Sequence, residues 1–519
     1  MVFGFSCQLG LLGFFSLGGF LVLFSFFFCC YDLTGFILSV YGGLGFDFVF
    51  CFGFGVFFFL FMLYCCGGLS ISYAYHYFVG GVFSCILVVN MVVFLFSMFG
   101  LVMSGNGLSS FIFWELLGVV SFFLILFYGN SVSLKAGWVT LVTSRFGDLG
   151  FFLFVGYFLS CFDDWWVLIF AFLLIIGSKS AVYPLISWLL EAMRAPTPVS
   201  SLVHSSTLVA AGFWFLYQYW HLIINFWFVV WFGWLCVLTI FLTSLVMLLV
   251  DDVKKIVALS TSNNLSWCFL FFLWGDMLLG LLQLVVHGLG KCVLFTVMGE
   301  LMSCNGSGQD YKGFYFGSNW LLCNVFFCAF SLCGFPFLGV YFSKHYFFSL
   351  IFMGGYSLFV GFVLLLGVLF SFCYSFRFVF ICFGSFYGGC YNFQLSSFFG
   401  GLFIPFFCFL CYFYLESFGV LFEHSSWIVV LVSFICFLGV CLGGFMVFYT
   451  NCFGLYCWGV SLCNLDFICY GFSYIFSLIQ YLSFVFLFRL DSFVVSSLFY
   501  FICCSSGLFF SFSFFLFLV

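Results

Sequence analysis

The sequence predicts a polytopic α-helical membrane protein, and composition and hydropathy carry that prediction. Apolar residues make up 66% of the 519 residues and charged residues only 5%, whereas a soluble domain has about 25% charged residues. The mean hydropathy is +1.34. The N-terminal stretch MVFGFSCQLGLLGFF lacks a charged n-region and an A-x-A cleavage site. We therefore expect a first membrane span there and not a signal peptide.

Polar and glycine-rich breaks divide the apolar stretches, which predicts about fifteen membrane helices of about 20 residues each. The expected spans are residues 9–30, 47–66, 81–104, 108–128, 135–161, 165–194, 198–218, 222–250, 255–275, 277–303, 320–346, 348–384, 398–419, 427–449 and 494–518. We expect interruptions near Pro184 and Pro336, because a proline removes a backbone donor from the helix.

The region 453–490 differs from the rest, because polar residues punctuate an apolar stretch. It contains Asn464, Asp466, Gln480 and Arg489. It forms either another span or a helix that lies along the protein or the membrane interface.

Composition also excludes several classes of site. The 28 cysteines form no CxxC pair with histidines at zinc spacing, so we expect neither a metal centre nor a disulfide framework. The net charge is −5 without a basic block, which does not favour nucleic acid as a partner. No P-loop or dinucleotide fingerprint lies in a strand–helix context, so nucleotide binding is not supported.

One stretch, residues 173–212, gathers polar features that are scarce elsewhere. It holds three of the five prolines, and it places Lys179 inside an apolar run five residues before Pro184. A proline leaves backbone carbonyls free, and a membrane protein tolerates such a break only inside the protein or beside a hydrated cavity. His204 follows in the next helix among serines and a threonine, whose hydroxyls suit a water chain. We interpret Lys179 and His204 as candidate proton carriers.

Two acidic positions lie in earlier spans. Glu115 is near the middle of its span, and a carboxylate there is costly unless it is protonated or paired. It is either a packing acid or a proton-carrying site. Arg145 and Asp148 lie at i, i+3 on one helix face. They form a local salt bridge, or Asp148 serves a neighbouring helix.

Basic residues recur later in the chain. His287 and Lys291 are spaced i, i+4, hence on one face, and their mutual repulsion when charged favours proton exchange over packing. Lys344 follows Pro336 as Lys179 precedes Pro184. The two interrupted helices stand five apart in our count, which suggests an internal repeat as in transporters with inverted halves.

A further group of charges, Asp251, Asp252, Lys254 and Lys255, lies between two spans. We interpret it as a solvated loop.

The stretch GSKSAVYPLISWLLEAMRAPTPVSSLVHSST resembles the antiporter-like membrane subunits of respiratory complex I and the related large subunits of cation/proton antiporters. Further matches are FIFWELLGVVSFFLI, SRFGDLG, DDVKKIVALSTSNNLSW, VVHGLGKCVLF and GFPFLGVYFSKH, and together they cover about residues 85–350. The A-P-T-P-V-S form differs from the H-V-E-A-P type of the paralogous subunit 4.

The resemblance implies two inverted five-helix repeats, each with a broken helix, and proton translocation. Glu115 and Lys179 match the paired carboxylate and lysine of that family, and Asp148 matches the acid after its R-x-G-D motif. The basic positions that match are His204, His287 and Lys291 on the central axis and Lys344 at the end of the second half-channel. The family also implies that 453–490 contains a lateral helix that precedes a last membrane anchor.

The resemblance and the span boundaries together predict five consecutive regions. They are N-terminal helices over 1–80, a first half-channel over 81–218, a second over 219–384, additional helices over 385–452, and the lateral helix with its anchor over 453–519.

Three features depart from the family pattern. Gln283 stands where the family usually has a histidine, and an amide takes no proton at ordinary pH. His345 stands where an acid often follows the lysine, so the usual neighbour of Lys344 is a titratable base. From the span count we also expect one N-terminal helix fewer than the family's fuller members carry.

The resulting hypothesis is a proton-translocating membrane subunit of NADH:ubiquinone oxidoreductase in the mitochondrial inner membrane. Glu115 and Lys179 would form a switchable ion pair. We expect no cofactor in this chain. NADH, FMN, Fe–S clusters and ubiquinone are expected in partner subunits, the partners being other membrane-arm subunits, especially the subunit 4 paralogue, and membrane lipids. The alternatives are an autonomous cation/proton antiporter and a structural scaffold.

Overall fold

The structure is a computed structural model that describes most of the chain between residues 36 and 448. The described ranges are 36–42, 46–78, 82–160, 165–223, 226–250, 252–274, 277–304, 319–335, 338–353, 358–383 and 426–448. All of them belong to one compact unit, Met1–Asn464, and the second unit, Leu465–Val519, lies outside the described residues.

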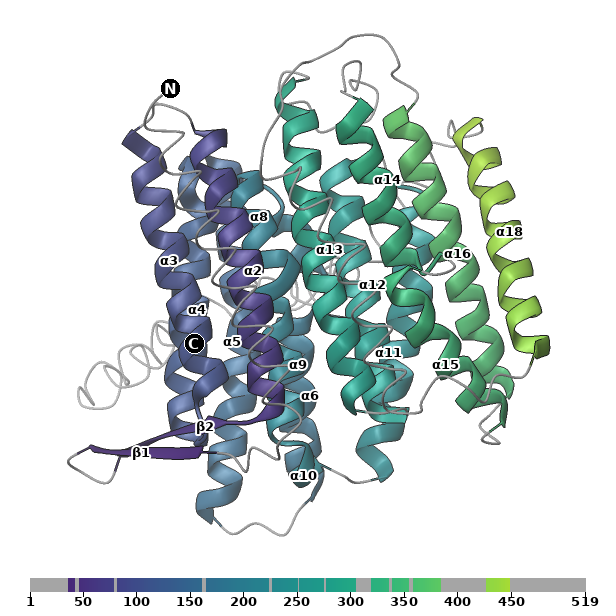
Figure 1. Ribbon diagram of the computed structural model, residues 1–519. Helices are drawn as coiled ribbons and strands as arrows, with labels where there is room; N and C mark the ends of the chain where they lie inside the picture. Colours follow the sequence, from purple (N-terminus) through teal and green to yellow (C-terminus); the bar gives the residue numbers. More distant parts are fainter. Residues whose placement is uncertain are drawn as a thin grey trace, which may run out of the picture. The chain divides into compact units, whose positions relative to one another are not determined.

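Helices dominate the described part of the chain (Figure 1). They are α2 (Phe54–Tyr77), α3 (Val82–Met103), α4 (Gly107–Ile125), η1 (Leu126–Tyr128), α5 (Ser131–Ser160), α6 (Trp165–Ser180), α7 (Ser187–Ala192), α8 (Thr197–Leu202), η2 (Val203–Thr207), α9 (Leu208–Gln218), α10 (Trp220–Ile223), α11 (Phe226–Met247), α12 (Val253–Trp274), α13 (Met277–Cys304), α14 (Asn319–Cys333), α15 (Gly339–Met353), α16 (Leu358–Phe383) and α18 (Ser426–Phe448). Within the described ranges, nine helical segments are long and apolar enough to span a membrane, and three shorter apolar helices accompany them. The predicted helical membrane fold is confirmed.

The outer faces of the helices are apolar. Large side chains such as Phe96, Trp138, Phe152 and Phe359 are each more than 60% exposed. A soluble protein rarely exposes so much apolar surface, whereas lipid tails solvate it well. Several lysines and histidines are instead buried between helices, as the bilayer favours. They are Lys179, Lys254, Lys291, Lys344, His204, His287 and His345.

Helix α13 connects the two halves of the sequence. It contacts α2, α8 and η2 from the first half, and α12, α14 and α15 from the second. Gly288 permits the close approach, since a Cβ there would lie 2.6 Å from the Met62 sulfur and 3.3 Å from the Ser206 Cβ. The basic residues of α13 are thereby held next to the segment that carries His204.

Two predicted boundaries were wrong. The span expected over 47–66 starts instead with β2 (Phe46–Phe52), which pairs antiparallel with β1 (Phe36–Gly42), and α2 then begins at Phe54. Phenylalanine and valine favour strands as well as helices, so hydropathy alone did not distinguish the two.

The span expected over 348–384 was also misplaced. Helix α15 runs on to Met353 and α16 begins at Leu358, because the apolar sequence gives no signal at residue 347 and the polar and glycine residues come at 354–357. The predictions for 9–30, 398–419, 494–518 and the region 453–490 fall outside the described residues. Pro336 itself also lies outside them, but α14 ends at Cys333 and α15 begins at Gly339, so the interruption expected near it is present.

Candidate functional site

The first interrupted helix lies where the sequence predicted it. Helix α6 ends at Ser180, one residue after Lys179, and α7 begins at Ser187. Ala181 has a left-handed φ of 53°, and the next N–H, that of Val182, bonds back to the Gly177 carbonyl at 3.3 Å. The chain therefore leaves the helix directly beside the lysine, before it reaches Pro184.

Lys179 is buried, with 2% of its surface exposed. Its Nζ lies 5.2 Å from the centroid of the Trp114 ring, a cation–π geometry. Gly118 leaves room for it, since a Cβ there would be 3.5 Å from Nζ. The charges of Asp148 and Glu115 also act on this ammonium group.

Arg145 organises those two carboxylates. Its Nη1 donates to the two Glu115 oxygens at 3.1 and 2.9 Å and to Asp148 Oδ2 at 2.9 Å. The i, i+3 pair of Arg145 and Asp148 therefore exists and extends to a neighbouring helix. Among the described residues, the salt-bridge partner of Glu115 is Arg145, whereas Lys179 has no carboxylate within 4.0 Å.

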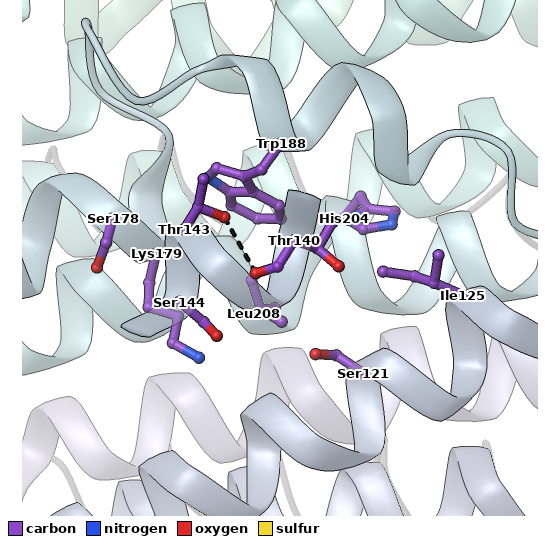
Figure 2. Close-up of a pocket in the computed structure, with 10 residues that line it drawn as sticks. All are labelled: Ser121, Ile125, Thr140, Thr143, Ser144, Ser178, Lys179, Trp188, His204 and Leu208. Atoms are coloured by element: carbon purple, nitrogen blue, oxygen red, sulfur yellow. Dashed lines mark hydrogen bonds between the residues drawn. The ribbon is translucent and has the colours of Figure 1, made fainter. Parts of the chain in front are cut away.

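A cavity of about 20 Å³ lies beside Lys179 (Figure 2), which is enough for one water molecule. Its lining includes Ser121, Ile125, Thr140, Thr143, Ser144, Ser178, Lys179, Trp188, His204 and Leu208. In this view the side chains of Thr140 and Thr143 lie between Lys179 and His204. The Thr143 hydroxyl donates to the Thr140 carbonyl at 3.0 Å, and its lone pairs can still accept from water.

His204 occupies a π-helical turn, η2, between α8 and α9. Such turns are rare and are frequent at functional sites. The imidazole is fully buried and its centroid lies 6.1 Å from that of Trp188. Within the described part of the chain, neither ring nitrogen has a partner of hydrogen-bond geometry.

Helix α13 places Gln283, His287 and Lys291 at four-residue intervals, all buried. Gln283 Oε1 accepts a hydrogen bond of 2.7 Å from Ser343 on α15, so this amide joins two helices. Lys291 Nζ donates to the Val257 carbonyl at 3.1 Å and to the Ser260 hydroxyl, both on α12.

A second cavity of about 20 Å³ lies beside Lys291. Its polar lining includes Ser260, Tyr374 and Ser375, contributed by α12 and α16. Lys179 and Lys291 therefore each have space for about one water molecule next to them.

Lys344 lies on the other side of a helix interruption. Its Nζ donates to the carbonyl of Cys333, the last residue of α14, at 2.8 Å, and lies 5.2 Å from the Trp267 ring centroid. Gly334, with a φ of 90°, begins the break. His345 is buried beside it.

Sequence reasoning missed several contributors. Trp114, Trp267 and Ser260 contact the lysines, although the tryptophans looked like ordinary apolar residues. The polar run STSNNLSW was a usable signal, because Asn263 and Asn264 are buried on α12 with side-chain atoms that lack a partner in the described ranges.

The interpretation of Lys254 as part of a solvated loop was wrong. Helix α12 begins at Val253, and Lys254 is buried with 7% of its surface exposed. Asp252 and Lys255 do form a partly exposed salt bridge, and Asp251 falls outside the described residues.

Metal ligation has no support in the described ranges, which contain no group of three histidine, cysteine or acidic residues able to hold an ion.

A family model described as the NADH:quinone oxidoreductase/Mrp antiporter transmembrane region matches residues 104–371. A Caenorhabditis elegans protein named NADH-ubiquinone oxidoreductase chain 5 is 34% identical over 319 residues, 59% of this chain and 58% of the relative. Its Ascaris suum namesake is 33% identical over 368 residues, 68% of this chain and 64% of the relative. The chain thus spans about three fifths of the length of these curated relatives.

Two solved structures share the fold. The Mrp complex from a Dietzia species superposes with a TM-score of 0.71 and 19% identity, over 96% of this chain and 60% of that one. The membrane-bound sulfane sulfur reductase, an archaeal respiratory membrane complex, gives a TM-score of 0.63 and 16% identity, over 79% and 88%.

Proposed function

We propose a proton-translocating role for this chain, which belongs to the NADH:quinone oxidoreductase/Mrp antiporter transmembrane family. In this proposal it is a membrane subunit of NADH:ubiquinone oxidoreductase in the mitochondrial inner membrane. The observation that carries the proposal is Lys179, a buried lysine at the end of a broken helix, beside a cavity that also reaches His204.

The first step is a change of partner at the arginine network. Arg145 holds Glu115 and Asp148 on one side of Lys179. When the Glu115 carboxylate turns from Arg145 toward Lys179, it stabilises the ammonium form; when it returns, the ammonium loses that partner and releases its proton toward the cavity. The switch therefore resides in the carboxylates, and Lys179 responds to it.

The second step is transfer along buried polar groups. His204, His287 and Asn263 each have a side-chain nitrogen without a partner among the described residues, and internal water ordinarily satisfies such groups. Protons pass through that water from Lys179 past His204 and His287 to Lys291.

The last step takes the proton from Lys291 to Lys344. Gln283, bonded to Ser343, orders water at the crossing from α13 to α15 without taking the proton itself. The division into two half-channels, 81–218 and 219–384, belongs to this proposal.

The energy for this transport comes from partner subunits. Moving one charge against 100 mV requires about 2.3 kcal/mol. The proposal places NADH, FMN, Fe–S clusters and ubiquinone in those partners, which include the subunit 4 paralogue. This chain supplies the path and the switch.

A second candidate is an autonomous cation/proton antiporter, because the family model that matches this chain also describes the Mrp antiporter. Purification of the chain from its native membrane distinguishes the two. We expect it to copurify with an NADH-oxidising assembly. Recovery in a smaller complex that exchanges Na⁺ or K⁺ for H⁺ would support the antiporter instead.

The site assignment is tested in the reconstituted complex with Lys179→Met. We expect fewer protons moved per NADH oxidised, because methionine fills the same space without carrying a proton. Lys135→Met, which changes an exposed lysine on α5, is the matched control. Unchanged proton yield with Lys179→Met would remove this residue from the path.

A further inference from the structure

Two adjacent lysines at the start of α12 have opposite surroundings. Lys255 is partly exposed and pairs with Asp252 in the preceding turn. Lys254 is buried at 7% exposure and points into the first half of the molecule, where its Nζ donates to the Ala195 carbonyl at 3.3 Å. Burying an ammonium group is unfavourable without a compensating contact, and this hydrogen bond offsets part of that cost.

The acceptor lies in the turn between α7 and α8, where neither helix uses the Ala195 carbonyl. In a continuous helix the N–H of residue 199 would bond to the Ala195 carbonyl. Here the N–H groups of Val199 and Ser200 both bond to the Pro196 carbonyl at 3.0 Å. The break between α7 and α8 therefore leaves the Ala195 carbonyl without a helical partner, and Lys254 from the other half of the sequence donates a hydrogen bond to it.

The segment that Lys254 holds also borders the first cavity. Helix α7 carries Trp188, which lines the cavity together with His204. The carbonyl of Ala192, one turn before Ala195, faces the His204 imidazole, although no hydrogen bond of ordinary geometry forms there among the described residues. A shift of the α7 end would change the space around His204.

We infer that Lys254 is a positioning residue that couples the second half to the proton path of the first by holding the end of α7 against His204. Movement of the start of α12 is then transmitted through the Ala195 carbonyl to the cavity beside Lys179. This inference rests on the proposed proton-translocating function.

The test compares Lys254→Met, Lys254→Gln and Lys254→Arg in the assembled, reconstituted complex. Lys255→Met is the matched control, since it removes the neighbouring charge without touching Ala195, and Lys179→Met is the reference for the path itself. The readouts are assembly on native gels, the rate of proton translocation and its dependence on pH at matched NADH oxidation.

We expect Lys254→Met to slow translocation roughly 2- to 30-fold, the range for residues that act through another. Its pH profile should shift, because the surroundings of His204 change. Arginine should restore the rate because it still donates, and glutamine should restore it in part. Lys255→Met should match the wild type.

Several outcomes would overturn the inference. One is wild-type translocation and pH profile in Lys254→Met while Lys179→Met is impaired. If Lys254→Met fails to assemble, a wild-type translocation rate and pH profile in Lys254→Gln would also overturn the inference. Failure of all three variants to assemble would assign a purely structural role. If Lys179→Met itself is unimpaired, the proposed function fails first.

Discussion

Lys179 and Lys344 both lie beside helix breaks. They share a contact with a tryptophan ring but differ in their polar partners. Each has a tryptophan ring 5.2 Å from its Nζ, Trp114 and Trp267 respectively. Lys179 has two carboxylates nearby that are bound to Arg145. Lys344 donates instead to a main-chain carbonyl, that of Cys333.

In the proposed mechanism, this difference makes Lys179 part of a switch and gives Lys344 a fixed main-chain partner. A carboxylate changes partner by rotating a side chain, and Glu115 already has an alternative partner in Arg145. A helix-terminal carbonyl moves only when the helix end moves. Rotation of the Glu115 side chain alone would therefore alter the surroundings of Lys179. The polar partner of Lys344 would move only if α14 shifts relative to α15.

The largest effect is expected from replacing either lysine by arginine. Arginine donates at the same places but stays protonated, so Lys179→Arg and Lys344→Arg should assemble and yet translocate no protons. Native gels and proton uptake in vesicles check this, with Lys135→Arg as the control. Normal translocation by either variant would mean that its lysine holds charge without exchanging protons.

A smaller effect is expected from Arg145→Met, which should act on the first lysine alone. Glu115 and Asp148 lose their shared donor, so translocation should slow roughly 10- to 100-fold, the value of a hydrogen bond to a charged group. Arg194→Met is the control, because Arg194 makes one exposed salt bridge to Glu191 and such pairs contribute little. Equal slowing in both variants would refute a special role for Arg145.

The smallest effect is expected from changing the feature that the two sites share, the tryptophan ring beside each lysine. Trp114→Phe and Trp267→Phe keep an aromatic face and weaken the cation–π contact, so each should slow translocation by roughly 2- to 5-fold. Trp138→Phe, at an exposed position on α5, should have no effect. A large loss at one site only would show that the two tryptophans are not equivalent.

The sequence predicted what depends on local chemistry. Pro184 predicted the interruption of α6 because proline has no N–H, and the i, i+3 spacing predicted the contact of Arg145 with Asp148. The resemblance to a family identified the lysines and histidines as candidate site residues. Their roles in proton transfer stay predictions that the variants above test.

The parts that could not be predicted depend on packing between distant segments. The Cys333 and Ala195 carbonyls carry no signature, because every residue has a carbonyl and only the fold decides which one is left free. Lys254 and Lys255 look equivalent in sequence, yet one is buried. The β1–β2 hairpin likewise depends on pairing between two apolar strands that resemble a span.

The central claim is that a hydrated polar path joins Lys179 to Lys344. A density map of the assembled complex that resolves ordered water tests it most directly. The account predicts waters in the cavities beside Lys179 and Lys291, and a connected series past His204, His287 and Gln283. A dry layer of apolar side chains between His204 and His287, maintained during turnover, would contradict it.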